Sequence, residues 1–287
     1  MDKWLLAVRV KTLPAAISPV ILGTALSYHD GIFYHFIFFM TLLAAVLIQI
    51  GANFANDVYD FEKGSDRADR LGPQRATQSG LISPTDMKKA MWKIFTLAIG
   101  VGFYLAYVGG WPIVIIGLAS ISAGIAYTGG PYPLGYYGFG DIFVFLFFGL
   151  IAVPGTYYLQ TGLVTELSLW LGAVMGMLVT AILVVNNLRD RDADIISGKK
   201  TLAVRFGKTF SKIQFILLVM LPFVLPFHLW RQWNKMSFLL TLFTLPIAVH
   251  LIIQLFNNTG VDLNKVLAGT ARFLFIFTLL LSAGLII

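Results

Sequence analysis

Long apolar segments separated by shorter polar ones make up most of this chain of 287 residues. Each segment comes close to the roughly 20 residues that an α-helix needs to cross a bilayer. The pattern therefore predicts about nine transmembrane helices, near residues 13–29, 36–56, 90–109, 111–129, 139–160, 167–188, 212–230, 236–256 and 266–287. Polar stretches near 57–89 and 189–211 are the only long segments expected to lie outside the membrane.

Composition supports this interpretation. Hydrophobic residues make up 57% of the chain and charged residues 12%, whereas an ordinary soluble domain carries about 25% charged residues. We therefore expect an all-α integral membrane protein, with its helices around a central cavity and one transmembrane domain over residues 1–287. Strands of a membrane barrel would be shorter and would alternate between apolar and polar positions.

The start of the chain predicts a retained first helix. Lys3, Arg9 and Lys11 precede a long apolar stretch, and no small-residue cleavage pattern follows, so a removed signal peptide is not expected. The chain has no cysteine, which excludes disulfides, thiolate metal sites and a cysteine nucleophile.

The formal net charge of +7 is distributed in a way that predicts topology rather than nucleic-acid binding. With a cytoplasmic N-terminus, all of the 21 basic residues except Arg231 and Lys235 fall on the cytoplasmic side. This asymmetry follows the positive-inside rule. We expect a multi-pass protein of the cell membrane, in contact with membrane lipids, whose two polar stretches face the cytoplasm.

Two acidic clusters lie directly against apolar segments, in a chain with only 14 acidic residues. One runs from Asn56 through Asp60 to Asp66, and the other from Asn187 to Asp194. An ionised carboxylate in a low-dielectric setting loses hydration at a cost of several kcal/mol unless a cation or hydrogen bonds replace the water. On a helix, residues four apart share a face, so Asn56 with Asp60, and Asp190 with Asp194, each present two oxygen atoms in one direction. The clusters therefore predict two halves of one cation site.

Oxygen ligands without histidine or cysteine favour Mg²⁺, which prefers one or two carboxylates together with phosphate oxygens and water. Two facing pairs would hold a diphosphate, and the nearby Lys63, Arg75 and Lys199 would neutralise its remaining charge. Such a site suits the ionisation of an allylic diphosphate. The carbocation would need an apolar cavity that excludes water, and aromatic side chains such as Tyr59 would add cation–π stabilisation.

Four local patterns carry a resemblance to a known family. They are Asn56-Asp57-Val58-Tyr59-Asp60 with Lys63-Gly64-Ser65-Asp66; Asp69-Arg70-Leu71-Gly72-Pro73-Gln74-Arg75; Tyr127-Thr128-Gly129-Gly130-Pro131-Tyr132-Pro133-Leu134-Gly135; and Asn186-Asn187-Leu188-Arg189-Asp190 through Asp194, Gly198-Lys199-Lys200-Thr201-Leu202 and Arg205-Phe206-Gly207. In this order and over nearly the whole chain, the sequence resembles the UbiA-type intramembrane aromatic prenyltransferases. Within them it is similar to the branch that acts on 1,4-dihydroxy-2-naphthoate in menaquinone biosynthesis.

The resemblance implies transfer of a polyprenyl group from polyprenyl diphosphate to 1,4-dihydroxy-2-naphthoate, with Mg²⁺ as cofactor and with loss of the carboxylate. The implied metal ligands are Asn56, Asp60, Asp66, Asp190 and Asp194, and the expected catalytic acids are Asp57, Asp60, Asp190 and Asp194. The candidate substrate-binding residues are Tyr59, Lys63, Arg75, Tyr127, Tyr132, Arg189 and Lys199. The broader family pattern places its last acid at position 64, which is Gly64 here. Asp66 comes two residues later, so its role as a direct ligand is open.

Two alternatives remain open at this point. One is another UbiA-type prenyltransferase with a different acceptor, such as hydroxybenzoate. The other is a cation-coupled transporter, for which acids near the bilayer midplane in discontinuous helices would be expected. Prenyl chain length, oligomeric state, the number of Mg²⁺ ions, the deprotonating base and the residue that holds the substrate carboxylate are not determined by the sequence.

Overall fold

The computed structural model of this chain describes residues 3–66 and 71–287, and the described part consists of helices and the turns between them. Positions 69 and 70 of the predicted Asp69–Arg75 motif lie outside the described residues. The α-helices are α1 (Lys3–Val8), α2 (Leu13–His29), α3 (His35–Glu62), α4 (Pro84–Gly109), α5 (Trp111–Ala126), α6 (Gly140–Val144), α7 (Ala152–Thr161), α8 (Glu166–Ile196), α9 (Leu202–Met220), α10 (Val224–Trp233), α11 (Leu245–Asn257) and α12 (Leu263–Ile286). Short helical segments join them: η1 (Val10–Thr12), the π-helical η2 (Phe145–Ile151), η3 (Leu221–Phe223), η4 (Met236–Thr244) and η5 (Gly260–Asp262).

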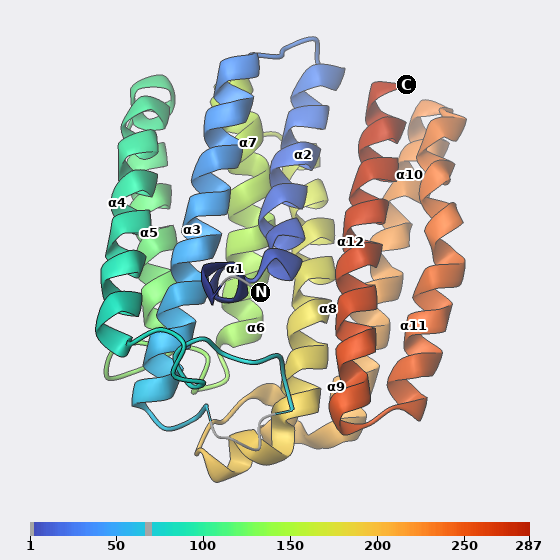
Figure 1. Ribbon diagram of the computed structural model, residues 1–287. Helices are drawn as coiled ribbons and strands as arrows, with labels where there is room; N and C mark the ends of the chain where they lie inside the picture. The colour runs from blue at the N-terminus through green and yellow to red at the C-terminus, as the bar shows by residue number, and fades with distance from the viewer. Residues whose placement is uncertain (1–2, 67–70) are drawn as a thin grey trace.

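Within the described residues, eight helical spans are long and apolar enough to cross a membrane. A ninth apolar helix, α5, is shorter, with 16 residues. Each of the predicted apolar segments corresponds to one of these spans, so the prediction of an all-α polytopic membrane protein is confirmed. The helices run roughly side by side in one bundle, with α4 and α5 at one edge and α10 and α11 at the other (Figure 1).

Three helices extend beyond the predicted apolar segments into residues that were expected to form polar loops. Helix α3 continues to Glu62, α8 continues to Ile196, and α4 begins at Pro84. Hydropathy falls at these positions because charged side chains begin there, but the backbone remains helical. Both acidic clusters therefore begin on regular helix, where residues four apart do share a face.

The predicted first span is interrupted near its start. Arg9 has a backbone φ of 54°, in the left-handed region, and separates α1 from η1. Asn53 on α3 holds this break in place, because its amide nitrogen donates to the Val8 carbonyl and to the Thr12 hydroxyl oxygen, each at 2.9 Å. Figure 1 shows α1 beside α3, about halfway along the bundle. The break thus brings the charged residues Arg9 and Lys11 close to the interior.

Close packing between α8 and η2 depends on glycine. A Cβ atom added to Gly149 would lie 2.5 Å from the carbonyl oxygen of Gly172 and 2.6 Å from Cα of Gly176. Such small-residue contacts let membrane helices approach closely. On the side facing α12, Leu178 belongs to the same buried apolar cluster as Phe277. These contacts fix α8 inside the bundle and position its polar C-terminal turns.

The ends of α3 and α8 lie at the same end of the bundle, together with the turns that follow them (Figure 1). The C-terminus of the chain lies at the opposite end. Both acidic clusters are therefore gathered at one end of the bundle.

Candidate active site

Asp60, two residues before the end of α3, is the centre of the first acidic cluster. It is 4% exposed. Its carboxylate accepts hydrogen bonds from the Tyr136 hydroxyl at 2.9 Å, Arg75 Nη2 at 3.2 Å, the Ser65 hydroxyl at 3.2 Å and Lys199 Nζ at 3.4 Å. These donors replace water around the buried charge, and two of them are cations.

Asp57 has a different environment, although it is one turn from Asp60. Its side chain is 1% exposed, and its two oxygens accept the backbone N–H groups of Ala76 at 3.1 Å and Thr77 at 2.9 Å. Asp57 does not line the cavity described below. The structure thus places Asp57 as an anchor for the loop that carries Arg75, and its catalytic role stays a prediction.

Arg75 joins Asp60 to Asp66. Its guanidinium lies 3.2 Å from an Asp60 oxygen and 3.3 Å from an Asp66 oxygen, and all three side chains are almost completely buried. Asp66 lines the cavity, as does Asn56, whose amide oxygen accepts a hydrogen bond from the Thr128 hydroxyl at 3.0 Å. Three of the predicted oxygen ligands of this half therefore face one space.

The second cluster is organised by Arg189 on α8. Its guanidinium donates to both oxygens of Asp190, at 2.8 Å to Oδ1 and in a shorter contact to Oδ2. It also donates to Asn264 at 2.7 Å and to Asn186 at 2.8 Å. Asn264, at the start of α12, donates in turn to the carbonyl of Leu71 at 2.9 Å. Arg189, predicted to bind substrate, therefore holds Asp190 in place and connects it to the loop after α3.

Lys199 lies between the two acidic clusters. Its Nζ lies 3.4 Å from Oδ1 of Asp60 and 4.0 Å from Oδ1 of Asp194. Gly198, with a φ of 75°, ends the turn after α8, and the Lys199 amide donates back to the Asp194 carbonyl at 2.9 Å. The predicted convergence of Asp60 and Asp194 is thus present, with an ammonium group between them.

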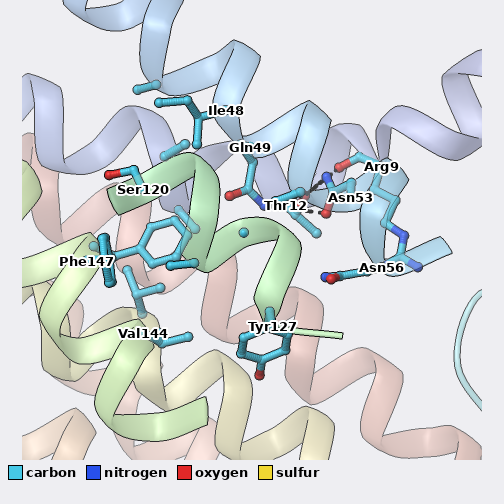
Figure 2. Close-up of a pocket in the computed structure, with 18 of the residues that line it drawn as sticks. Arg9, Thr12, Ile48, Gln49, Asn53, Asn56, Ser120, Tyr127, Val144 and Phe147 are labelled. Carbon is cyan, nitrogen blue, oxygen red and sulfur yellow. Dashed lines mark hydrogen bonds between the residues drawn. The ribbon is translucent and has the colours of Figure 1, made fainter. Parts of the chain in front are cut away.

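The acidic clusters open on a cavity of about 1470 Å³. Asn56, Asp60, Asp190 and Asp194 line its polar end, while mostly apolar side chains line the rest, including Ile48, Leu105, Phe143, Val144, Phe147 and Phe148. Figure 2 shows Phe147, Val144 and Tyr127 facing this space, opposite Asn53 and Asn56. The cavity thus joins a charged mouth to an apolar interior.

The predicted aromatic residues do not all reach the cavity. Tyr127 lines it, and burial raises the pKa of its phenol above the ordinary value, with the charge of Asp141 adding to the shift. Tyr132 is 74% exposed and packs only against Tyr137 among aromatic rings of the described residues. Tyr59 lies outside the lining, with Lys88 Nζ 5.5 Å above its ring.

Tyr136, which was not predicted, lines the cavity at its mouth. Its hydroxyl bonds Asp60, and the ammonium of Lys199 lies 4.6 Å from its ring centroid. Burial raises the pKa of this phenol, and Asp60 raises it further, so the hydroxyl remains a donor. The ammonium of Lys63 also lies near this ring, 5.1 Å from its centroid, and donates to the Gly130 carbonyl at 2.9 Å. Burial lowers the pKa of Lys63.

Three cations that were predicted only to set the topology also line the cavity: Arg9, Lys11 and Arg272. In Figure 2, Arg9 and Asn56 lie on the same side of the pocket. Arg272 lies well inside α12, a position where a charged side chain signals a functional site in a membrane span. That signal was present in the sequence, as a basic residue within the apolar segment 266–287.

The residues at the cavity mouth fit a magnesium site to which the protein contributes only a few ligands. Among the described residues, no three histidine or acidic side chains approach closely enough to hold a metal ion alone. Asp60 and Asp194 nevertheless lie within reach of one ammonium group, and both are oxygen donors. This arrangement suits Mg²⁺, which binds through one or two carboxylates and takes its remaining ligands from phosphate oxygens and water.

These features define a polytopic membrane protein with a charged site at the mouth of an apolar cavity. The chain belongs to the UbiA prenyltransferase family, whose model matches residues 16–285. It is 41% identical to a 1,4-dihydroxy-2-naphthoate octaprenyltransferase from Escherichia coli strain K12 over 71% of this chain and 68% of that protein. It is 34% identical to the protein of the same name from Haemophilus influenzae, over 100% of this chain and 96% of that protein.

Solved structures agree with the fold. A UbiA homolog from Aeropyrum pernix K1 superimposes with a TM-score of 0.71 at 12% identity, covering 94% of this chain and 96% of that one. A UbiA homolog from Archaeoglobus fulgidus gives a TM-score of 0.65 at 14% identity, covering 99% of both chains. At these identities the likeness concerns the arrangement of helices.

Proposed function

We propose that this chain transfers a polyprenyl group from polyprenyl diphosphate to 1,4-dihydroxy-2-naphthoate, giving demethylmenaquinone in its reduced, quinol form, with Mg²⁺ as cofactor. The single observation that carries the proposal is the convergence of Asp60 and Asp194 at the mouth of one large apolar cavity. The names of the relatives from Escherichia coli and Haemophilus influenzae support the choice of acceptor. A structural neighbour from Archaeoglobus fulgidus is described as bound to GPP and Mg²⁺, which is consistent with the proposed site.

The polar end of the cavity would bind the diphosphate through Mg²⁺. Asp60 and Asp194, which lie near the same ammonium group, would hold the ion together with phosphate oxygens and water, while Asp190 and the amide oxygen of Asn56 line the same mouth. When bound there, Mg²⁺ supplies positive charge that stabilises the leaving diphosphate. Lys199 lies between the two clusters and is 18% exposed, so it is placed to donate to phosphate oxygens.

The remaining residues of the mouth keep this arrangement in position. Arg75 neutralises Asp60 and Asp66, and Arg189 orients the carboxylate of Asp190. Tyr136 donates to Asp60 and keeps its proton because its pKa is raised. The chain therefore presents carboxylates of fixed orientation, which reduces the reorganisation needed when a ligand binds.

The apolar interior accommodates the prenyl chain and excludes water from the reacting carbon. Phe143 and Phe147 stack with their ring centroids 5.9 Å apart and both line the cavity. Aromatic faces directed at a developing carbocation stabilise it by about 0.5–2 kcal/mol each. In the reaction the carbon–oxygen bond to the diphosphate breaks, a carbon–carbon bond to the ring forms, and the carboxylate leaves as CO₂.

We place the charged end of the bundle at the cytoplasmic face of the cell membrane. Lys63 follows α3, Lys200 precedes α9, and Lys88 and Arg205 lie near the starts of α4 and α9, in agreement with the positive-inside rule. A prenyltransferase with a different acceptor would use the same mouth. A cation-coupled transporter is less well supported, since Asp60 and Asp194 lie in the last turns of α3 and α8.

An assay of the purified protein in lipid vesicles tests the proposal. The protein is mixed with octaprenyl diphosphate and 1,4-dihydroxy-2-naphthoate, with Mg²⁺ or with EDTA, and product mass and released CO₂ are measured. The proposal predicts prenylated, decarboxylated product with Mg²⁺ alone. Absence of product with a series of prenyl diphosphates, or equal product in EDTA, contradicts it.

A further inference from the structure

Arg272 is a charged residue inside a membrane span, without a partner among the described residues. It lies nine residues after the start of α12, which corresponds to about 14 Å along the helix. Within the described part of the chain, Arg75, Arg189, Arg191 and Arg205 each form ion pairs or hydrogen bonds, whereas Arg272 forms neither. Arg231 shares this property, but it lies in the last turn of α10, outside the cavity.

The face of α12 that carries Arg272 is directed at the candidate active site. Asn264, Ala268 and Arg272 are spaced four residues apart, and all three line the cavity. The opposite face carries Phe273 and Phe277, which are completely buried in the apolar core. Side chains on a helix lean toward its N-terminus, which for Arg272 is the direction of Ala268 and Asn264.

Asn264 shows where Arg272 lies relative to the acidic residues of the mouth. Its amide oxygen accepts a hydrogen bond from Arg189, which holds Asp190. Arg272 therefore lies on the same wall of the cavity as Asp190, two helical turns deeper into the membrane. Lys11 lines the cavity from η1, a segment that packs against α12. The deeper part of the cavity thus carries positive charge that the acids of the mouth do not neutralise.

Arg272 is exposed to the cavity, and a guanidinium that opens on a cavity from within a membrane span, without an acidic partner among the described residues, indicates an anionic ligand. The described acids at the mouth do not supply it, since Asp60, Asp66 and Asp190 are already paired with Arg75, Lys199 and Arg189. The diphosphate is also poorly placed to supply it, because Lys199 and the carboxylates that bind Mg²⁺ lie at the mouth. The remaining anion of the proposed reaction is the acceptor.

We infer that Arg272 binds the carboxylate of the aromatic acceptor. The ring must lie next to the first carbon of the prenyl chain, on the apolar side of the diphosphate, and Arg272 lines the cavity deeper than Asn264, on that side of the mouth. A planar guanidinium matches a carboxylate through two parallel hydrogen bonds. The inference rests on the proposed function and assigns the residue that would select an acidic ring over a neutral one.

The test compares two acceptors: 1,4-dihydroxy-2-naphthoate and 1,4-dihydroxynaphthalene, which is the same ring without the carboxylate. Arg272→Gln should lower kcat/KM for the acid by about 10- to 100-fold, the usual effect of losing hydrogen bonds to a charged group. It should leave kcat/KM for the neutral diol and the KM for prenyl diphosphate within about 3-fold. Arg272→Lys should restore part of the activity with the acid.

Arg231→Gln is the matched control and should behave as the wild type with both acceptors. Equal losses with the acid and the diol, a selective rise in the KM for prenyl diphosphate, or an unchanged preference for the acid in Arg272→Gln would each overturn the inference. If Arg272→Gln does not fold, Arg272→Lys must still show the selective loss with the acid. A wild-type protein that prenylates neither acceptor would overturn the proposed function itself, whereas an active wild type with an unselective Arg272→Gln variant overturns only the role of Arg272.

Discussion

Lys199 Nζ lies 3.4 Å from Oδ1 of Asp60, although the two residues are 139 positions apart in the chain. This contact joins the end of α3 to the turn that follows α8. The same ammonium lies 4.0 Å from Asp194, so a single cation lies between the acids of both halves. A metal–diphosphate complex at this place would bring both the divalent charge and the phosphate oxygens that Lys199 can bind.

Replacing Lys199 with alanine should therefore weaken diphosphate binding without unfolding the protein. Loss of hydrogen bonds to a charged ligand should raise the KM for prenyl diphosphate by about 10- to 100-fold. Steady-state kinetics with varied diphosphate measures the effect. Lys208→Ala is the control, since Lys208 is exposed and contacts only Asp192 among the described acids. An unchanged KM in Lys199→Ala would show that this lysine does not bind the phosphates.

Asp57 and Asp60 should respond differently to the same substitution. Asp57→Asn removes a charged acceptor from two buried backbone N–H groups and should reduce the free energy of unfolding by about 1–3 kcal/mol. The loop that carries Arg75 would be loosened, and activity would fall with stability. Thermal unfolding in detergent reports the loss. Asp192→Asn, on the exposed side of α8, should stay within about 0.5 kcal/mol of the wild type. A stable, fully folded but inactive Asp57→Asn variant would instead assign Asp57 to the chemistry.

Asn264→Ala should alter the site from a distance. It removes the hydrogen bonds to Arg189 and to the Leu71 carbonyl, so the carboxylate of Asp190 loses part of its support. The Mg²⁺ concentration needed for half-maximal activity should rise by about 3- to 10-fold. A magnesium titration of activity measures this shift. Asn257→Ala, at the exposed end of α11, is the control. A fall in melting temperature with no change in magnesium dependence would indicate a purely structural role for Asn264.

Gly149→Ala tests the packing that positions α8. The added Cβ would lie 2.5 Å from the Gly172 carbonyl oxygen, so the helices must move apart. Overpacking of this kind typically reduces stability by about 1–3 kcal/mol. Gly100→Ala is the matched control, because nothing lies within 4 Å of its added Cβ, and removal of a helical glycine stabilises by up to about 1 kcal/mol. Melting temperatures of both variants should therefore move in opposite directions. Equal melting temperatures would contradict the packing argument.

The membrane spans were predictable because hydrophobicity along a spanning helix is nearly continuous. The spacing of Asp60 and Asp194 beside such segments also indicated where charge would gather. The pairing of Arg189 with Asp190 was not predictable, since adjacent residues on a helix generally point in different directions. Local patterns also gave no reason to expect that Asn264 and Tyr136, from remote segments, would complete the site.

The helix boundaries and the roles of the aromatic residues were likewise only partly predictable from the sequence. Hydropathy falls at charged side chains, but a helix continues as long as its backbone hydrogen bonds are made, as α3 and α8 do. Tyr132 shares a motif with Tyr127 but is 74% exposed, because the chain reverses its direction in the turn between the two residues. Contacts between distant segments therefore decided which members of each predicted set reach the cavity.

Calorimetric titration of a non-hydrolysable geranyl thiodiphosphate tests the central claim most directly. The wild type should bind this analogue only when Mg²⁺ is present, and both Asp60→Asn and Asp194→Asn should lose that binding while Asp192→Asn retains it. Because Asp60 and Asp194 lie on different helices, loss in both variants requires one ligand shared by the two halves. Undiminished, magnesium-dependent binding in either Asp60→Asn or Asp194→Asn, or equal binding by the wild type in EDTA, would contradict a metal–diphosphate site formed between α3 and α8.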